Sequence, residues 1–199
     1  MSTSPIPLNE SLRQVHCLLW QPGQTLHPDW WHYWQMEAQQ RVYPQLSLSG
    51  QRQIDRQILA RMCRTSMLPF QLSDKHVPLL RLQRRLATCL SALGLQLLGC
   101  AGYLWLREYR EALSCVFSEQ QIKQIAVLMP DGTKPLSLSA DAIVTASLQT
   151  GWQAMQSQWC ADPVWQALKW TLPRLQAECH EPGTVDDPLA ALIRLERFL

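Results

Sequence analysis

LATCLSALGLQLLGCAGYLWL, residues 86–106, is a stretch of 21 residues that holds eight leucines and no charged side chain. Its length fits a membrane span, which needs roughly 20 consecutive apolar residues. The alternative is a helix buried at the centre of a domain that folds in water. Gln96 interrupts the apolar run, and Gly99 and Gly102 fall where a spanning helix would cross the hydrocarbon. We therefore favour the buried helix over the membrane span.

Gly99 predicts where this buried helix ends. A glycine directly after an apolar periodic segment commonly marks a helix C-terminus, because it adopts the left-handed conformation without strain. We expect one helix to end near Leu98 and a second helix, from Tyr103, to pack back on it as a hairpin. A helix that continued through Gly102 would contradict this prediction. The leucines expected to be buried in the hairpin are Leu90, Leu93 and Leu97.

The composition predicts an all-α fold. Leu, Gln, Arg and Ala are abundant while Ile, Val, Phe and Tyr are scarce, which favours helices over strands. We expect a compact, irregular helical domain of about eight or nine helices around the central Leu-rich hairpin. The expected parts are a flexible N-terminus over residues 1–11, the helical domain over residues 12–173, and a C-terminal linker and helix over residues 174–199 packed on the same domain.

Local signals predict where several helices begin. Ser118 and Gln121 have the spacing of a capping box, in which each side chain bonds the backbone of the other residue. An apolar stripe over residues 79–97 indicates one long helix that runs into the uncharged stretch. The other predicted helix starts are Ser49, Ser139, Asp162-Pro163 and Asp187-Pro188.

The cysteines and the N-terminus indicate the cytoplasm. The seven cysteines are odd in number and never form C-x-x-C, and most lie in apolar runs, where a free cysteine behaves as a small hydrophobe. The first residues, MSTSPIPLNESLRQ, lack the basic start and the apolar core of a secretory signal. We expect reduced cysteines and a cytoplasmic localisation.

No pattern in the sequence indicates a catalytic, cofactor or metal site. The chain has no G-x-S-x-G, no Walker A motif and no G-x-G-x-x-G. His27 and His32 fall on different faces of a helix turn, and the side chains of the adjacent pair Cys179 and His180 diverge, so neither pair has the spacing of a metal site. A zinc site assembled from distant residues stays open as an alternative. We expect no enzymatic activity, no cofactor and no metal.

Arginine and tryptophan are the residue types that point to binding. Residues 41–85 carry nine Lys or Arg against two acidic residues, a net charge of +7, while the rest of the chain sums to −5. Three of the nine tryptophans crowd one short segment after Pro28, and Trp and Arg are enriched at interface hot spots. The candidate partner-binding residues are Arg52, Arg56, Arg64, Arg81, Arg84, Arg85, Trp30, Trp31 and Trp34.

The arginines have three possible explanations. Solvated helix faces are the explanation we favour for most of them, and an acidic protein partner is the main alternative. Clustered arginines also neutralise phosphates in nucleic-acid-binding proteins, but the net charge of the whole chain is only +2 and no recognisable nucleic-acid motif is present. The residues alone therefore predict a helical protein-binding module, with a helical nucleic-acid-binding protein as the alternative.

Three segments carry a resemblance to a known family. They are LHPDWW at residues 26–31, LSALGLQLLGCAGYLWLREYREALSCVFSEQQIKQIAVL at residues 90–128, and SLQTGWQAMQSQW at residues 147–159 with its continuation ALKWTLP at residues 167–173. In pattern and order they resemble the SctK (YscK/PscK-like) family, which are accessory proteins of the cytoplasmic sorting platform of type III secretion systems. The resemblance extends from about Val15 to Pro173, and none of these segments is a catalytic signature.

The resemblance implies a non-enzymatic cytoplasmic adaptor. Proteins of this family are similar in linking the forkhead-associated cytoplasmic domain of the inner-membrane ring protein (SctD-like) to the pod protein of the sorting platform (SctQ-like). It implies a location at the cytoplasmic face of the inner membrane through protein partners, without direct membrane insertion and without nucleic acid. It assigns no contact to any single residue.

Overall fold

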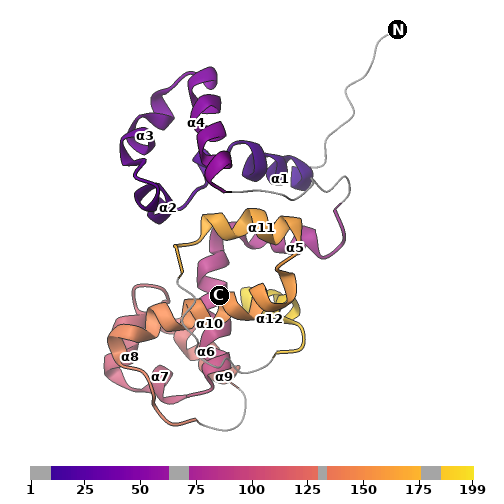
Figure 1. Ribbon diagram of the computed structural model, residues 1–199. Helices are drawn as coiled ribbons and strands as arrows, with labels where there is room; N and C mark the ends of the chain where they lie inside the picture. The colour runs from indigo at the N-terminus through magenta and orange to yellow at the C-terminus, as the bar shows by residue number, and fades with distance from the viewer. Residues whose placement is uncertain (1–9, 63–71, 130–133, 176–184) are drawn as a thin grey trace. The chain divides into compact units, whose positions relative to one another are not determined.

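The computed structural model describes residues 10–62, 72–129, 134–175 and 185–199 (Figure 1). Within these ranges the chain forms helices and no strand, so the predicted all-α fold class is confirmed. Among the described residues, no helix is long and apolar enough to cross a membrane.

The contacts of the chain divide it into two compact units, each assembled from two separate stretches. Unit 1 consists of Met1–Gln83 and Ala161–Arg174, and unit 2 consists of Arg84–Cys160 and Leu175–Leu199. The expected parts, residues 1–11, 12–173 and 174–199, stay a prediction.

Unit 1 is built from short helices around an aromatic core. Its helices are α1 (Glu10–Trp20), η1 (Pro22–Gln24), α2 (Pro28–Tyr33), α3 (Glu37–Val42), η2 (Tyr43–Gln45), α4 (Leu48–Arg61), α5 (His76–Arg81), α11 (Pro163–Leu168) and η4 (Lys169–Thr171), and η3 (Leu82–Arg85) leads from α5 towards unit 2. One cluster of its buried side chains consists of Leu26, Trp31, Met36, Tyr43, Ile54, Ile58 and Met62. Burial of this apolar surface is the main force that holds such short helices together.

A buried carboxylate fixes η1 against α4 in unit 1. Asp55 is 1% exposed and accepts hydrogen bonds from the Gly23 backbone N–H at 2.9 Å and from the Tyr43 hydroxyl at 3.1 Å. Gly23 allows this approach, because a Cβ there would lie 2.5 Å from the Tyr43 ring. Burial raises the pKa of the Asp55 carboxyl above its usual value, and the two hydrogen bonds only partly oppose this shift.

Unit 2 is organised around the crossing of two long helices. Its helices are α6 (Leu86–Leu98), α7 (Gly102–Trp105), α8 (Arg107–Leu113), α9 (Glu119–Val127), α10 (Ala140–Trp159) and α12 (Pro188–Glu196). The helix α10 packs mainly on α6 and also on α8, and α12 packs on α6 (Figure 1). At the crossing a Cβ on Gly94 would lie 1.7 Å from the Ser147 carbonyl oxygen, and a Cβ on Gly151 would lie 2.0 Å from the Leu90 carbonyl oxygen. Both glycines are therefore required for the two backbones to approach this closely.

The prediction for the central stretch, residues 86–106, is confirmed in part. Gly99 has φ of 68°, the left-handed conformation, and ends α6, so no helix continues through Gly102. The prediction that a second helix from Tyr103 packs back on α6 is wrong. The helix α7 is a single turn of four residues, and the main partner of α6 is α10. Leu90 and Leu93 are buried as predicted. Leu97 is only half-buried, so the prediction for this residue is also wrong.

The local sequence signals predicted most of the helix starts correctly. The capping box of Ser118 and Gln121 is present, and the side chains of Asp162 and Asp187 cap α11 and α12. Ser139 precedes α10 but makes no side-chain cap, and α4 is capped by Ser47 rather than Ser49. The single long helix predicted over residues 79–97 is wrong, because the 3-10 helix η3 separates α5 from α6.

The free cysteines divide between the core and the surface. Cys89 and Cys100 are buried, Cys17 is half-buried, and Cys115 and Cys160 are exposed. Burial raises the pKa of the Cys89 thiol to about 11, as expected for a cysteine that serves as a small core hydrophobe. Three of these five cysteines are therefore at least half-buried, and two are at the surface. Cys63 and Cys179 lie outside the described residues.

Candidate protein-binding surfaces

Two of the candidate arginines lie on the exposed side of one helix in unit 1. Arg52 and Arg56 are four residues apart on α4 and are both exposed, so their side chains leave the same face. They line a hollow of about 390 Å³ together with Trp20, Gln21 and Leu59. In the described part of the chain no acidic side chain forms an ion pair with either arginine. We call these five residues the arginine hollow.

The buried contacts described above hold the walls of the arginine hollow in place. Gln21 directly precedes η1, and the Gly23 N–H bond to Asp55 ties η1 to α4. Asp55 lies between the two arginines in sequence, yet its carboxylate is in the core and is engaged by Gly23 and Tyr43. The one acidic residue of α4 is thus buried, and its outer face stays cationic.

Trp20 gives the arginine hollow an apolar wall that the sequence did not reveal. Its side chain is 56% exposed at the end of α1, so a large aromatic ring lies at the surface beside the two arginines. The sequence signal was weak, since Trp20 ends an ordinary amphipathic stripe and only the fold brings it beside α4.

Two of the candidate tryptophans, Trp30 and Trp34, form an aromatic cluster of unit 1 with Trp170. The ring centroids of Trp30 and Trp170 are 4.6 Å apart, those of Trp34 and Trp170 are 5.6 Å apart, and the Trp30 indole N–H donates to the Leu172 carbonyl oxygen at 3.0 Å. Trp30 and Trp34 are half-buried, whereas Trp31 is 1% exposed. Trp31 therefore offers no surface to a partner, and this candidate is corrected to a core residue.

The remaining candidate arginines do not join the arginine hollow. Arg81 is exposed at the end of α5 in unit 1, and Arg84 and Arg85 are exposed in η3 and belong to unit 2. The charge of Arg85 acts on the Cys89 thiol and partly opposes the effect of burial on its pKa. Arg64 lies outside the described residues.

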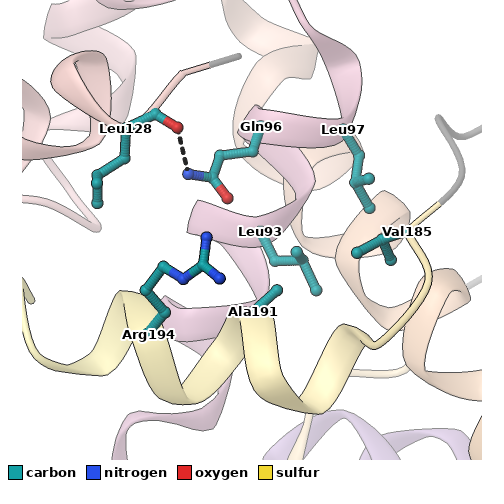
Figure 2. Close-up of a pocket in the computed structure, with 7 residues that line it drawn as sticks. All are labelled: Leu93, Gln96, Leu97, Leu128, Val185, Ala191 and Arg194. Atoms are coloured by element: carbon teal, nitrogen blue, oxygen red, sulfur yellow. Dashed lines mark hydrogen bonds between the residues drawn. The ribbon is translucent and has the colours of Figure 1, made fainter.

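A second hollow, of about 380 Å³, lies in unit 2 (Figure 2). It is lined by Leu93, Gln96 and Leu97 of α6, Leu128 after α9, and Val185, Ala191 and Arg194 from the C-terminal stretch. The Gln96 side-chain amide donates to the Leu128 carbonyl oxygen at 2.9 Å, as the dashed line in Figure 2 shows. Sequence reasoning missed this pocket, because its residues come from three distant stretches. We call it the α6–α12 pocket.

Within the described ranges the titratable side chains form no metal cluster, and His76 and Asp162 form a largely buried pair. In unit 1 the Ser73 backbone N–H donates to His76 Nδ1 at 3.1 Å, so Nε2 carries the hydrogen and donates to Asp162 Oδ2 at 2.8 Å. The other oxygen of Asp162 accepts from the N–H groups of Val164 and Trp165. The pair ties α5 to the start of α11, which is a structural task.

The comparisons with known proteins give one match. A family model described as a type III secretion system subunit matches residues 13–174. No curated protein and no solved structure matches the chain. The matched range begins within α1 and ends after α11, so it contains the arginine hollow, the aromatic cluster and four of the seven residues of the α6–α12 pocket. The chain belongs to this family of type III secretion system subunits.

Proposed function

We propose that this secretion-system subunit is a non-enzymatic, SctK-like adaptor of the sorting platform. It links the cytoplasmic forkhead-associated domain of the inner-membrane ring protein to the pod protein. Its place is the cytoplasmic face of the inner membrane, where these two proteins hold it. The family match supports the secretion system, and the resemblance of residues 26–31, 90–128 and 147–173 supports the adaptor.

The observation that carries the proposal is the pair of arginines in the arginine hollow that no described acidic side chain neutralises. Arg52 and Arg56 present two guanidinium groups on one helix face, beside the exposed ring of Trp20. A guanidinium matches a carboxylate in two parallel hydrogen bonds, and Trp and Arg together supply much of the binding energy at protein interfaces. An acidic surface of a partner protein therefore complements the arginine hollow. We assign this acidic surface to the ring protein.

The half-buried edge of the aromatic cluster is the second docking surface in this proposal. Trp30 and Trp34 keep part of their rings accessible, and Tyr33 beside them is 54% exposed. The Arg174 guanidinium stacks 3.8 Å from the centroid of the Tyr33 ring. We assign this aromatic surface to the pod protein.

The test is a pair of binding assays with the purified full chain. The cytoplasmic domain of the ring protein and the pod protein are each immobilised, and binding of wild type is compared with that of the double variant Arg52→Glu/Arg56→Glu. We expect the variant to lose at least about tenfold in affinity for the ring protein, because two attractions become repulsions, and to keep its affinity for the pod protein. The wild-type affinity for the ring protein should fall with added salt.

A matched control carries the same change of charge elsewhere in unit 1. Arg13 and Arg41 are exposed and do not line the arginine hollow, so Arg13→Glu/Arg41→Glu should bind both proteins as wild type does. Absence of binding to either protein would overturn the adaptor function. A salt-dependent mobility shift of DNA or RNA that Arg52→Glu/Arg56→Glu abolishes would instead favour nucleic-acid binding.

A further inference from the structure

We propose that the α6–α12 pocket is a separate docking site for a short segment of another protein, one that carries a large apolar side chain next to a carboxylate. This site lies wholly in unit 2. It is independent of the two surfaces assigned above, all of whose residues belong to unit 1.

The first observation is apolar surface that the described residues leave unfilled. Leu97 continues the apolar stripe of α6, yet it is only half-buried, because it faces the pocket rather than another helix. Leu93, Leu128 and Val185 complete the apolar lining, and the small side chain of Ala191 leaves room on the α12 side (Figure 2). Cavities of about 150 Å³ already accommodate a benzene ring, so about 380 Å³ admits a large aliphatic or aromatic side chain.

The second observation is the charge at the rim of the α6–α12 pocket. Arg194 extends its guanidinium from α12 toward Gln96 across the apolar lining (Figure 2). It forms no ion pair with any acidic side chain that the structure describes. A carboxylate placed beside the inserted apolar side chain would supply the missing partner.

The polar groups inside the pocket restrict what can enter. One N–H of the Gln96 side-chain amide donates to the Leu128 carbonyl oxygen and fixes the amide, and the Gln96 side-chain oxygen can accept a hydrogen bond from a backbone N–H. The pocket thus combines an apolar slot, a cation and an acceptor, which together fit a peptide segment. A protein segment is the occupant we favour over a free lipid-like acid, because this chain is a subunit of a multiprotein secretion system.

The experiment is a selection of peptides from a random library displayed on phage, with the full-length chain as the target. We expect the enriched sequences to share a large apolar residue within two positions of Asp or Glu. The affinity of one synthetic peptide of this kind is then measured by fluorescence anisotropy for wild type and for three variants.

Two of the variants alter the pocket and one is its control. Ala191→Leu fills the slot and keeps a good helix former in α12, and Arg194→Glu reverses the charge at the rim. Each should weaken binding at least about tenfold. Arg197→Glu makes the same change of charge on an exposed residue beside α12 that does not line the pocket, and it should bind as wild type does. Circular dichroism confirms that each variant is folded, and Arg194→Glu alone suffices if Ala191→Leu does not fold.

Three results would overturn the proposal. The first is a selection without the expected consensus, and the second is a peptide that binds Arg194→Glu as tightly as wild type. The third is saturable binding of laurate, blocked by Ala191→Leu, in the absence of peptide binding, since the pocket would then serve a small amphipathic acid. None of these results concerns Arg52 or Arg56, so the adaptor function is tested independently by the binding assays with the ring protein and the pod protein.

Discussion

Gly94 of α6 and Gly151 of α10 face each other, and each occupies the space that a side chain on the other helix would need. A Cβ on Gly94 would lie 3.0 Å from the Gly151 nitrogen, and a Cβ on Gly151 would lie 3.2 Å from the Gly94 nitrogen. The obstacles are backbone atoms, which cannot rotate away as a side chain can. The contact between the two longest helices of unit 2 therefore depends on these two glycines.

Gly94→Ala and Gly151→Ala should each lower the free energy of unfolding by at least about 3 kcal/mol, because the added methyl group forces α6 and α10 apart. Urea denaturation followed by circular dichroism measures this loss. Gly50→Ala is the matched control, since its Cβ would meet only the Leu46 side chain, at 3.2 Å. We expect a change of less than about 1 kcal/mol there. Equal losses at Gly50 and Gly94 would contradict the close helix crossing.

Gly99→Ala should be destabilising for a different reason. A Cβ at Gly99 would meet the Lys134 side chain at 3.5 Å, an ordinary contact, so the cost is the strain of its positive φ, about 1–2 kcal/mol. Asparagine tolerates the left-handed conformation better than alanine, and Gly99→Asn should recover part of the loss. The same urea measurements apply, and a Gly99→Asn variant less stable than Gly99→Ala would refute this explanation.

Asp55 should give the stability of the protein a characteristic dependence on pH. Burial raises the pKa of this carboxyl in the folded state, so the folded chain keeps the proton at pH values where the unfolded chain has released it. The stabilisation is complete below the unfolded pKa of about 3.9 and is lost as the pH rises through the folded pKa. Asp55→Asn keeps an oxygen acceptor for Gly23 and Tyr43 but does not titrate.

The measurement is the free energy of unfolding of wild type and Asp55→Asn at a series of pH values from about 3.9 upward. The difference, wild type minus variant, should fall as the pH rises through this window and then level off. A difference that rises with pH would mean that the folded state favours the ionised carboxylate, and that its hydrogen bonds outweigh its burial.

Asp162→Ala should lower the free energy of unfolding by more than the loss of an ordinary helix cap does. The substitution removes the cap of α11, worth about 1 kcal/mol, and also the acceptor of the His76 Nε2 hydrogen, which adds about 1–3 kcal/mol for a buried donor. Asp187→Ala is the control, since the described contact of that side chain is the cap of α12 at the Ala190 N–H. Thermal unfolding compares the two variants, and equal losses would argue against a role for His76.

The features that could be predicted from the sequence are those that depend on residues close together in the chain, such as helix caps and helix ends. Ser118 and Gln121, Asp162 and Asp187 act on the backbone within one helix turn, and Gly99 ends its helix through its own φ, so a local pattern identifies them. The choice of α10 as the partner of α6 depends on Gly94 and Gly151, which are far apart in sequence. An isolated glycine in an apolar helix indicates a close contact without saying with what.

The candidate surfaces were predictable only in part, for the same reason. Arg52 and Arg56 share a face because they are one helix turn apart, and this could be seen in the sequence. Trp20 joins them through the fold, in which the bond between Gly23 and Asp55 ties η1 to α4, and no sequence pattern marks Asp55 as buried. Trp31 looked equivalent to Trp30 and Trp34, yet the core of unit 1 encloses it, and periodicity over so short a helix does not separate the three.

The division of the chain into two interleaved units has a consequence for its synthesis. Unit 1 needs residues 161–174 and unit 2 needs residues 175–199, so the ribosome completes neither unit early. The Trp30 indole finds its acceptor only at Leu172, and the His27 N–H finds its acceptor only at Trp170. The tryptophan-rich segment is therefore synthesised long before its partners. It cannot follow the usual order of folding, in which the N-terminal part folds first. These two hydrogen bonds of the tryptophan-rich segment can form only after residues 170–172 have been made.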